Sequence, residues 1–453
     1  MNKDGSDARI VIVGAGSSSF GLGTLGDLMT VGGQKLAGAT VVLHDISEEM
    51  LNLVGGVFKL AMKEASEDGD EPPFKMEAST DPKIALQDAN YVVMSIEHGN
   101  RLATWEQDYY VPLKHGCRQI YGENGGPGGA FHTFRQVPPM LNIARIMEDV
   151  CPDAWLLNYS NPVPRVTWAI NRATKIKTVG LCHGIGSGLR GITRILGVGS
   201  NALDFISAGL NHFYFFIKCK AKRDLTIQSM GHYPEKKVNA GEDLLPYIRE
   251  RGIIWAKQEE LTLIEELLRT FGYFTYPDQS HPGEYLHFGA AYCPHVKYGF
   301  RGSNEAYKAR LASSIKGEID NYWWVHWTNE RAVPIMIGIE HDTNQEEIAL
   351  NMENAGCITN LPVDCTVEAP GRVDRNGPKL DKVGDLPRGI ANLLQQQVAI
   401  QDLVVEAAIT GDYNTAVQAL SVDPTVPSPC VARSLLDEML QLQGDYLPQF
   451  IRK

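Results

Sequence analysis

One stretch near the start of the chain constrains its fold more than any other. A β-branched apolar run, Arg9–Val13, breaks at Gly14-Ala-Gly16, and a helix-compatible segment follows. This order is typical of the first strand, tight turn and first helix of a dinucleotide-binding sheet. Gly14 permits the turn, and Gly16 lets the backbone approach a pyrophosphate, which the free N–H groups at the helix start then bind. The third glycine of the usual fingerprint is absent, because Ser19 stands in its place.

A second apolar run, residues 39–44, ends at Asp45. A carboxylate at the tip of the second strand accepts the ribose hydroxyls of NAD and would repel the extra phosphate of NADP. The alternative is that Asp45 only forms the turn that ends the strand. We expect an NAD site made by Gly14, Gly16, Ser17, Ser18, Phe20, Asp45 and Ser95.

Composition limits the classes of partner. A chain of 453 residues is too long for one small core, so two domains are expected. The net charge of −12 argues against nucleic acid and against an anionic membrane as partners. No apolar run approaches membrane-spanning length, and the polar start of the chain does not predict a signal peptide. Eight cysteines scattered singly predict a reducing cytoplasm rather than a disulfide framework.

Residues 9–180 alternate between strand-like and helix-like patterns, which predicts a doubly wound parallel sheet. The expected strands are Ile10–Val13, Thr40–His44, Tyr91–Ile96, Trp155–Asn158 and Thr178–Leu181. From about residue 195 strands around a turn give way to long helical stretches. We therefore predict an α/β fold, with an N-terminal Rossmann-like domain over residues 1–195 and a C-terminal α+β domain over residues 196–453, which would carry the substrate, metal and oligomer contacts.

Ligands of such a sheet bind at the carboxyl ends of its strands. Polar clusters follow three of the predicted strands directly, at residues 95–99, 158–162 and 182–184. Between them runs a glycine-dense segment, residues 121–129, which carries Glu123 and is followed by Arg135. We interpret it as a loop on the substrate side, the alternative being a flexible surface turn.

Cys182 and His212 form the sharpest chemical pair, each at the end of an apolar run. A thiolate and an imidazole suit a borderline-soft divalent metal. Two ligands are too few for a structural zinc site, so they would suit an open site completed by water and substrate oxygens. The alternative for each is a buried core residue.

Several motifs in one order resemble glycoside hydrolase family 4, and the resemblance covers nearly the whole chain. They are Gly14-Ala-Gly16-Ser-Ser-Ser-Phe20, Gly126-Pro-Gly-Gly129, Asn161-Pro162, Cys182-His183-Gly184, Gly209-Leu-Asn-His212, Asn354-Ala-Gly356, Asn360-Leu-Pro362, Val367-Glu368-Ala-Pro370 and Ala416–Pro424. Members of this family are glycosidases that use NAD and usually a divalent metal, commonly manganese, outside the usual two-carboxylate scheme. The resemblance also implies a homodimer or homotetramer acting on a small-molecule glycoside.

The resemblance implies roles for individual residues. Cys182 and His212 match the metal ligands, and Asn161 matches an asparagine that touches the sugar hydroxyls. His183 follows the metal cysteine and would lie near the leaving group as general acid. The Cys-His-Gly form is similar to the α-glucuronidase subgroup, whereas phospho-sugar members carry aspartate or asparagine in place of His183.

The catalytic base is expected in the segment His281–Phe288, which supplies a tyrosine base in several members of the family. Tyr285 is the predicted base, and Asp278, His281 and Glu284 compete for the role. In the implied reaction, hydride leaves carbon 3 of the sugar for NAD, the base removes the proton on carbon 2, and the aglycone is eliminated. Water addition and return of the hydride complete a hydrolysis without net redox change.

A uronate substrate needs a counter-charge, and arginine fits a carboxylate best. The candidates are Arg101, Arg301 and Lys297, and Glu123 is the expected acidic partner on the substrate side. Within the same family an α-galacturonidase, an α-galactosidase or an α-glucosidase is the alternative. Two rival functions of other classes also remain open at this point: a plain NAD-dependent sugar or hydroxy-acid dehydrogenase, which needs no metal, and a non-catalytic NAD-binding sensor or scaffold.

Overall fold

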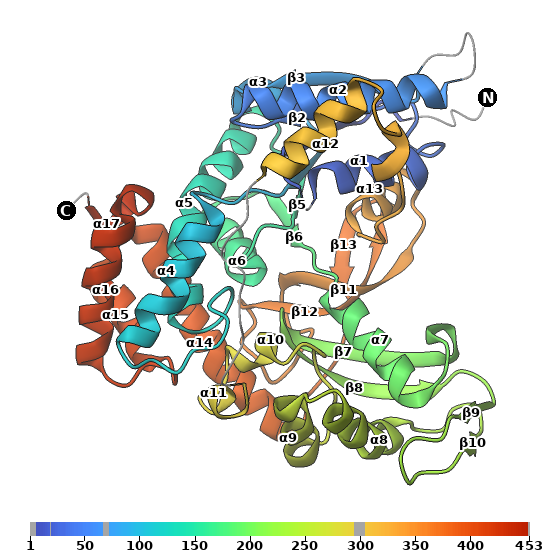
Figure 1. Ribbon diagram of the computed structural model, residues 1–453, viewed down its shortest axis with the longest axis vertical. Coiled ribbons are helices and arrows are strands. Elements are labelled where there is room, and N and C mark those ends of the chain that lie inside the picture. The colour runs from blue at the N-terminus through green and yellow to red at the C-terminus, as the bar shows by residue number, and fades with distance from the viewer. Residues whose placement is uncertain (1–5, 19, 67–71, 294–303, 452–453) are drawn as a thin grey trace.

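The computed structural model describes residues 6–18, 20–66, 72–293 and 304–451. Arg301 and Lys297, predicted as contacts for a substrate carboxylate, lie outside these residues. In the described part the dominant feature is a single 11-stranded sheet with the order β3-β2-β1-β4-β5-β6-β11-β12-β7-β8, and β13 pairs with β12 (Figure 1).

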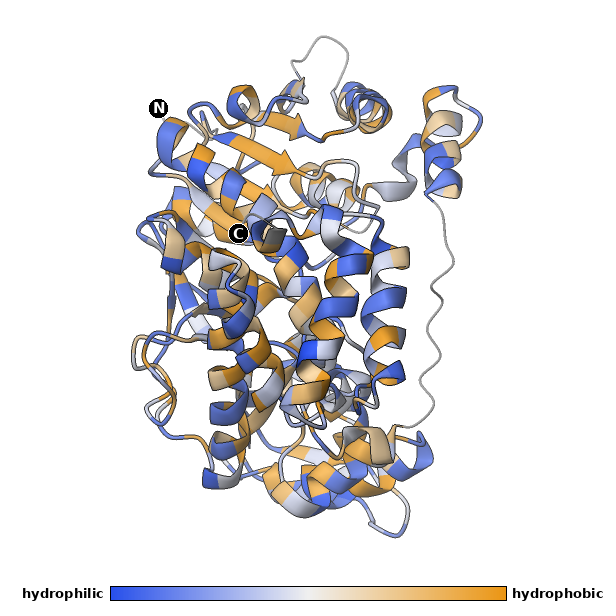
Figure 2. Ribbon diagram, turned by 90° about the vertical axis from the view of Figure 1, so that its left-hand side faces the viewer, coloured by the Kyte–Doolittle hydropathy of each residue, from blue (hydrophilic) through white to orange (hydrophobic). Residues whose placement is uncertain are grey.

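The first six strands run parallel in the order of a dinucleotide-binding fold, as the sequence predicts. They are β1 (Arg9–Val13), β2 (Thr40–His44), β3 (Lys75–Ser79), β4 (Tyr91–Met94), β5 (Trp155–Asn158) and β6 (Lys177–Gly180). Successive residues of β1 alternate between two cores, since Ile10 and Ile12 face one and Val11 and Val13 face the other. The strands β1, β2, β4, β5 and β6 are therefore buried on both sides, which explains their continuous apolar runs (Figure 2), whereas the edge strand β3, which the sequence analysis did not predict, is exposed or half-buried along its length.

The later strands extend the same sheet antiparallel. They are β7 (Leu203–Leu210), β8 (Phe213–Ala221), β11 (Gln345–Glu353), β12 (Thr366–Asp374) and β13 (Gly377–Leu380), while β9 (Leu225–Ile227) and β10 (Lys236–Val238) form a separate pair. Because β11 pairs with β6, the sheet runs across the predicted boundary at residue 196.

Helices cover both faces of the sheet. One face carries α1 (Gly21–Thr30), α2 (Glu48–Ala65), α12 (Glu305–Ile315) and α13 (Ala332–His341). The other carries α3 (Pro82–Leu86), α5 (Gly126–Val150), α6 (Val163–Ala173), α14 (Arg388–Thr410), α15 (Tyr413–Val422) and α16 (Pro429–Gln443), with α4 (Arg101–Lys114) beside them. Residues after 300 thus complete a core begun by the first 180 residues.

A third core lies below the antiparallel end of the sheet in Figure 1. It is built by α7 (Gly184–Leu196), α8 (Leu245–Gln258) and α9 (Thr262–Phe271) against β7 and β8. The short helices α10 (Ser280–Gly283) and α11 (Gly289–Tyr292) follow, and α17 (Pro448–Ile451) ends the described chain. None of the described helices combines the length and the apolar content that crossing a bilayer requires.

One local expectation was wrong. The glycine-dense segment was predicted as a loop, but its second half, from Gly126, is the first turn of α5. Gly125 serves as the N-cap residue, and Pro127 fits the start of a helix because its missing N–H is not needed there. The segment is buried rather than a flexible surface turn, because Asn124 is fully covered.

Candidate active site

The glycine turn after β1 has the shape that the sequence predicts. Gly14 has φ +86°, and a Cβ built on it would lie 2.2 Å from the carbonyl oxygen of Ser95, just past β4, so a side chain cannot be accommodated. Gly16 N–H donates to Asp45 Oδ2 at 2.9 Å. The turn and the tip of β2 are therefore held together, and a Cβ on Gly16 would fill the space beside Asp45 and Met50. This cradle fits a dinucleotide phosphate and ribose.

The other predicted NAD residues surround that turn. Ser95 and Ser17 place their hydroxyls 3.4 Å apart, and Ser18 is exposed beside them. Phe20, the N-cap residue of α1, stacks on Tyr159 with ring centroids 4.7 Å apart. Phe20 therefore packs the start of α1 against the end of β5.

His212 occupies the tight turn between β7 and β8. Its backbone φ is +64°, a conformation that costs free energy for a residue with a side chain and that clusters at functional sites. The side chain is buried, and its Nδ1 lies 2.7 Å from the amide nitrogen of Asn124. Burial, followed by the nearby His281, lowers the pKa of His212 to about 3. The imidazole is thus neutral at physiological pH, which is the form that binds a metal.

Cys182 lies just beyond β6. Its sulfur accepts the N–H of Gly184 at 3.4 Å, and a Cβ built on Gly184 would lie 3.5 Å from the same sulfur. Burial raises the pKa of the Cys182 thiol to about 12, and hydrogen bonds from Asn211 and Gly184 oppose that rise. A divalent cation would be the group that makes the thiolate form at neutral pH.

A cluster of polar side chains lies next to His212. Asn161 Nδ2 donates to Glu123 Oε1 at 3.2 Å, and Glu284 Oε2 accepts the N–H groups of Glu123 and Asn124 at 3.0 Å each. Three acceptor atoms there have no hydrogen-bond partner among the described residues: Asn124 Oδ1, Asn161 Oδ1 and Glu284 Oε1. Buried acceptors without partners are costly, so a cation, water or sugar hydroxyls fit this place.

Within the described parts of the chain, no group of three or more His, Cys, Asp and Glu side chains could hold a metal ion by itself. The two-ligand site at Cys182 and His212 therefore stays a prediction, in which water and substrate oxygens would complete the coordination. The chemistry of the donor atoms and the unpartnered acceptors beside His212 fit a divalent metal.

The predicted base, Tyr285, is buried, and its ring stacks on Phe213. Its hydroxyl donates to the backbone carbonyl of Asn211 at 3.2 Å, next to the turn that carries His212. Burial, followed by Glu284, raises the pKa of Tyr285 well above its usual value, and Arg165 opposes that rise. Arg165 is itself fully buried on α6. Its charge opposes the rise in the Tyr285 pKa without reversing it, so the hydroxyl is neutral in this environment.

The competing candidates for the base differ in environment. Asp278 is 59 % exposed, and hydrogen bonds from His281 and Ser280 outweigh burial and hold its pKa below the usual range. His281 stacks on Tyr276 and has its ring centroid 4.4 Å from that of His212. Burial raises the pKa of Glu284, whose Oε1 lies 3.9 Å from His212 Nδ1.

His183 is 58 % exposed at the start of α7, where its Nδ1 lies 3.1 Å from Glu330 Oε1. Its hydrogen bond to Glu330 raises the pKa of His183, with burial acting in the opposite direction. Glu330 comes from a segment distant in sequence, so the sequence analysis gave no signal for this pairing.

The arginines have unequal roles. Arg101 is exposed at the first residue of α4. Against the effect of burial, the pKa of Glu97 is lowered mainly by His132 and Arg135, and Arg101 adds a smaller decrease. Arg135, expected to follow a substrate-side loop, instead lies inside α5, 1 % exposed, and pairs with Asp108 at 2.8 Å. Its partner shows that Arg135 is a structural cation of the core.

Sequence reasoning missed several residues beside the predicted ones. Asn124, which contacts His212, lies inside the glycine-dense segment, residues 121–129. Its position in that segment was the signal that could have identified it. Glu97 and His132 pair at 3.2 Å at the end of β4. The others come from distant segments: Arg165, Tyr276, Glu330 and Glu368.

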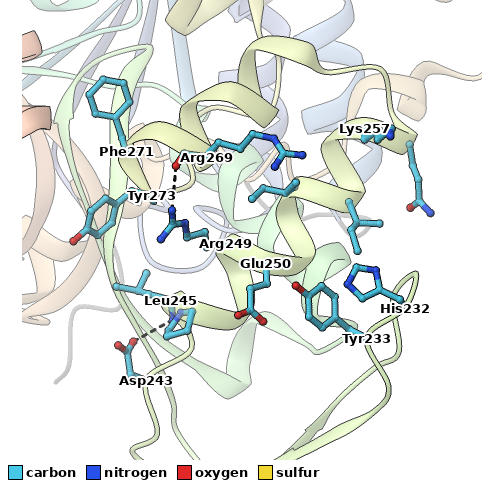
Figure 3. A pocket seen from close by; sticks show the side chains of 15 residues that line it. His232, Tyr233, Asp243, Leu245, Arg249, Glu250, Lys257, Arg269, Phe271 and Tyr273 are labelled. Carbon is cyan, nitrogen blue, oxygen red and sulfur yellow. Dashed lines mark hydrogen bonds between the residues drawn. The ribbon is translucent and has the colours of Figure 1, made fainter.

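A hollow of about 1160 Å³ lies apart from this cluster, where α8 and α9 meet residues near β9 and β10 (Figure 3). Its lining mixes cations, Arg249, Lys257 and Arg269, with the carboxylates Asp243 and Glu250. None of the predicted site residues lines it.

Residues 9–198 match the sequence model of the family 4 glycosyl hydrolases, and residues 207–426 match that of their C-terminal domain. The chain belongs to glycosyl hydrolase family 4. The predicted family and the prediction of a glycoside hydrolase are thereby confirmed.

Relatives of this family 4 chain carry several specificities. An alpha-glucosidase from Erwinia rhapontici is 35 % identical, over 97 % of this chain and 98 % of its own length. An alpha-galactosidase from Rhizobium meliloti (strain 1021) is 29 % identical, over 98 % and 89 %. A 6-phospho-alpha-glucosidase from gut microorganisms, solved in complex with NAD and Mn²⁺, has a TM-score of 0.79 at 23 % identity, covering 98 % of this chain and 100 % of its own. This last likeness confirms the predicted fold class.

Proposed function

We propose that this family 4 enzyme is an NAD- and divalent-metal-dependent glycosidase that cleaves α-linked uronic acid glycosides. One observation carries the proposal. The glycine turn tied to Asp45 lies at the carboxyl edge of the parallel strands, and Asn161, just past β5 at that edge, is linked through Glu123 and Asn124 to His212. A dinucleotide and a sugar bound at that edge would meet, as they must for hydride transfer.

Gly14, Gly16 and Asp45 would hold NAD, and Cys182 and His212 would hold the metal, most simply Mn²⁺. The NAD and Mn²⁺ of the related 6-phospho-alpha-glucosidase structure support this choice. When bound, the two groups supply a reversible hydride acceptor for carbon 3 of the sugar and a Lewis acid for its oxygens.

The remaining work falls to side chains of the chain itself. Asn161 and Glu123, which are hydrogen-bonded to each other, orient the sugar hydroxyls. Tyr285 removes the proton on carbon 2, and the buried charge of Arg165 offsets part of the rise that burial gives to the pKa of its hydroxyl. His183, held by Glu330, donates a proton to the departing oxygen. Asp278 acts indirectly, because its carboxylate pairs with the His281 ring and holds that ring beside the site.

The uronate specificity rests on the Cys182-His183-Gly184 form and on Arg101, which is exposed at the first residue of α4. A second candidate is an α-glucosidase, which the 35 % identical relative favours by its name. Cytoplasmic location and a homodimer or homotetramer remain predictions from the sequence, and gel filtration with light scattering tests the second.

The decisive experiment uses aryl α-glycosides of glucuronic acid, galacturonic acid, glucose, galactose and 6-phosphoglucose, with NAD, Mn²⁺ and a thiol reductant. Elimination makes the carbon 2 hydrogen exchangeable, so hydrolysis in heavy water should leave deuterium at carbon 2 of the released sugar. Absence of that deuterium would overturn the mechanism. Cleavage of neutral sugars alone would keep the mechanism and replace the uronate assignment by the α-glucosidase. Net formation of NADH in step with substrate would instead identify a dehydrogenase.

A further inference from the structure

Glu368 on β12 is a buried carboxylate to which the reaction gives no task. It is fully covered, and its Oε1 accepts hydrogen bonds from Asn211 Nδ2 at 3.0 Å and from Asn351 Nδ2 at 3.1 Å. Its other oxygen, Oε2, has no partner within the described ranges. A buried carboxylate is costly in a sheet, so its place there calls for a function.

The register of the sheet places Glu368 in a row that crosses four strands. Gly180 on β6 is paired with Asn351 on β11, Asn351 with Glu368 on β12, and Glu368 with Gly209 on β7. The chain leaves this row at its two ends. Past Gly180 it reaches Cys182, and past Gly209 it reaches His212, so the row joins the strands that deliver the two predicted metal ligands.

Strand spacing shows why these ligands need a further constraint. Neighbouring strands lie about 4.8 Å apart, so β6 and β7 are separated by roughly 14 Å along the row. A metal bound by one sulfur and one nitrogen needs bonds of about 2.0–2.3 Å, which brings the two donor atoms within about 4.5 Å of each other. The segments after β6 and β7 must therefore lean toward each other and be held there.

Asn211 is placed to hold them. It immediately precedes His212 in the turn, and its side chain is fully buried. Its amide donates to Glu368 and also hydrogen-bonds the Cys182 thiol. Asn211 thus adjoins one ligand in the chain, and its side chain hydrogen-bonds the other ligand and the carboxylate fixed at the centre of the row. The left-handed backbone of His212 gives the turn little intrinsic preference for this shape, so the anchor is needed.

We propose that Asn211 and Glu368 are positioning residues that set the separation of Cys182 and His212 for a divalent cation. The inference rests on the proposed function, because it takes those two residues as the metal ligands. Outer partners of this kind typically change metal affinity by about 10–100-fold.

The test compares two full-length variants, each of which lacks one amide donor to Glu368. Asn211→Ala and Asn351→Ala each remove one amide donor from Glu368 Oε1, but only Asn211 touches a ligand. Mn²⁺ affinity is measured by titration followed through the electron paramagnetic resonance signal of free Mn²⁺. The near-ultraviolet thiolate charge-transfer band of the Co²⁺-loaded protein reports the Cys182 bond directly. NAD affinity and thermal unfolding are measured in parallel, and Asn211→Ser, which suits a turn, replaces Asn211→Ala if the latter does not fold.

We expect Mn²⁺ affinity to fall about 10–100-fold in Asn211→Ala, with a weakened Co²⁺ band, and to stay within about twofold of wild type in Asn351→Ala. NAD affinity should be unchanged in both. Equal Mn²⁺ losses in the two variants, or wild-type affinity in Asn211→Ala and Asn211→Ser, would overturn the proposal. If Cys182→Ser leaves Mn²⁺ affinity unchanged, the predicted metal site fails, and the positioning role fails with it.

Discussion

The backbone N–H of Gly16 and the carboxylate of Asp45 are joined by a hydrogen bond of 2.9 Å, so the glycine turn and the tip of β2 form one unit. Asp45 Oδ1 also accepts the N–H of Ser47, the N-cap residue of α2. A single carboxylate therefore shapes the turn, caps the approach to a helix and faces the place expected for a ribose.

Asp45→Ala should weaken NAD binding by about 1–3 kcal/mol, because ribose hydroxyls would lose their acceptor. Calorimetric titration with NAD measures the change. Asp412→Ala is the matched control, since Asp412 also accepts a backbone N–H, at the start of α15, which packs into the core on the opposite face of the sheet from α1 and α2. Unchanged NAD affinity in Asp45→Ala would remove Asp45 from the site.

Cys182→Ser and His212→Ala should each lose Mn²⁺ binding and Mn²⁺-dependent hydrolysis. Binding in the wild-type protein should also weaken at acid pH, because both ligands must be deprotonated. Cys430→Ser, at an exposed cysteine, serves as the control for loss of a thiol. Full activity of the two ligand variants after treatment with a chelator would contradict the metal assignment.

Tyr285→Phe should reduce hydrolysis by about 10²–10⁴-fold, the usual effect of removing a positioned acid or base. The substitution removes the hydroxyl that donates to the Asn211 carbonyl and leaves the ring stacked on Phe213, so NAD affinity should not change. Steady-state rates and the deuterium content at carbon 2 are the measurements. Retained exchange at carbon 2 would move the base to His281 or Glu284.

The Glu97–His132 pair predicts a pH-dependent contribution to stability. Although burial alone would lower it, the pairing with Glu97 raises the pKa of His132 above its ordinary value of about 6.5. The contribution is therefore fully present below about pH 6.5 and is lost as pH rises through the raised pKa. Glu97→Gln should destabilise the protein by about 1.5–3 kcal/mol near pH 6 and by less at pH 9. Urea unfolding at both pH values tests this, and an equal loss at both would contradict it.

Asp108→Asn should be the most destabilising of these changes, at about 3–5 kcal/mol, because the buried charge of Arg135 would lose its close partner and keep only Glu97, at 3.9 Å. Both side chains of the pair are 1 % exposed. The exposed pair Glu265–Arg269 supplies the contrast, since Glu265→Gln should cost less than about 1 kcal/mol. Equal shifts of the two urea midpoints would show that burial does not control the effect.

Five of the six parallel strands could be predicted closely because each carries its own apolar signal, whereas the edge strand β3 was missed because it is exposed and has no apolar run. The expected Thr40–His44 and Trp155–Asn158 coincide with β2 and β5, and the other three strands differ only at their ends. Strands that are buried on both faces appear in the sequence as short apolar runs between turn residues, so they can be recognised without knowing which distant residues pack on them.

The parts that could not be predicted depend on contacts between distant residues. The start of α5 looks like a loop because its glycines lack helix propensity, and only Glu284, which accepts the N–H groups of Glu123 and Asn124, completes that helix end. Arg135 looks like a substrate cation until Asp108 is seen beside it. Asn211 and Glu368 are hydrogen-bonded although they are 157 residues apart in the chain, and no local sequence pattern around either residue indicates this contact.

The continuous sheet has a consequence for the order in which the protein can form during synthesis. When the ribosome has released the first 200 residues, β6 is a sheet edge with open N–H and C=O groups, because its neighbour β11 lies at Gln345–Glu353. The apolar surfaces of α2 and α1 against which α12 and α13 pack are also uncovered at that stage. The nascent nucleotide-binding half therefore keeps an unpaired sheet edge until most of the message has been translated. Other chains could pair with that edge during this time.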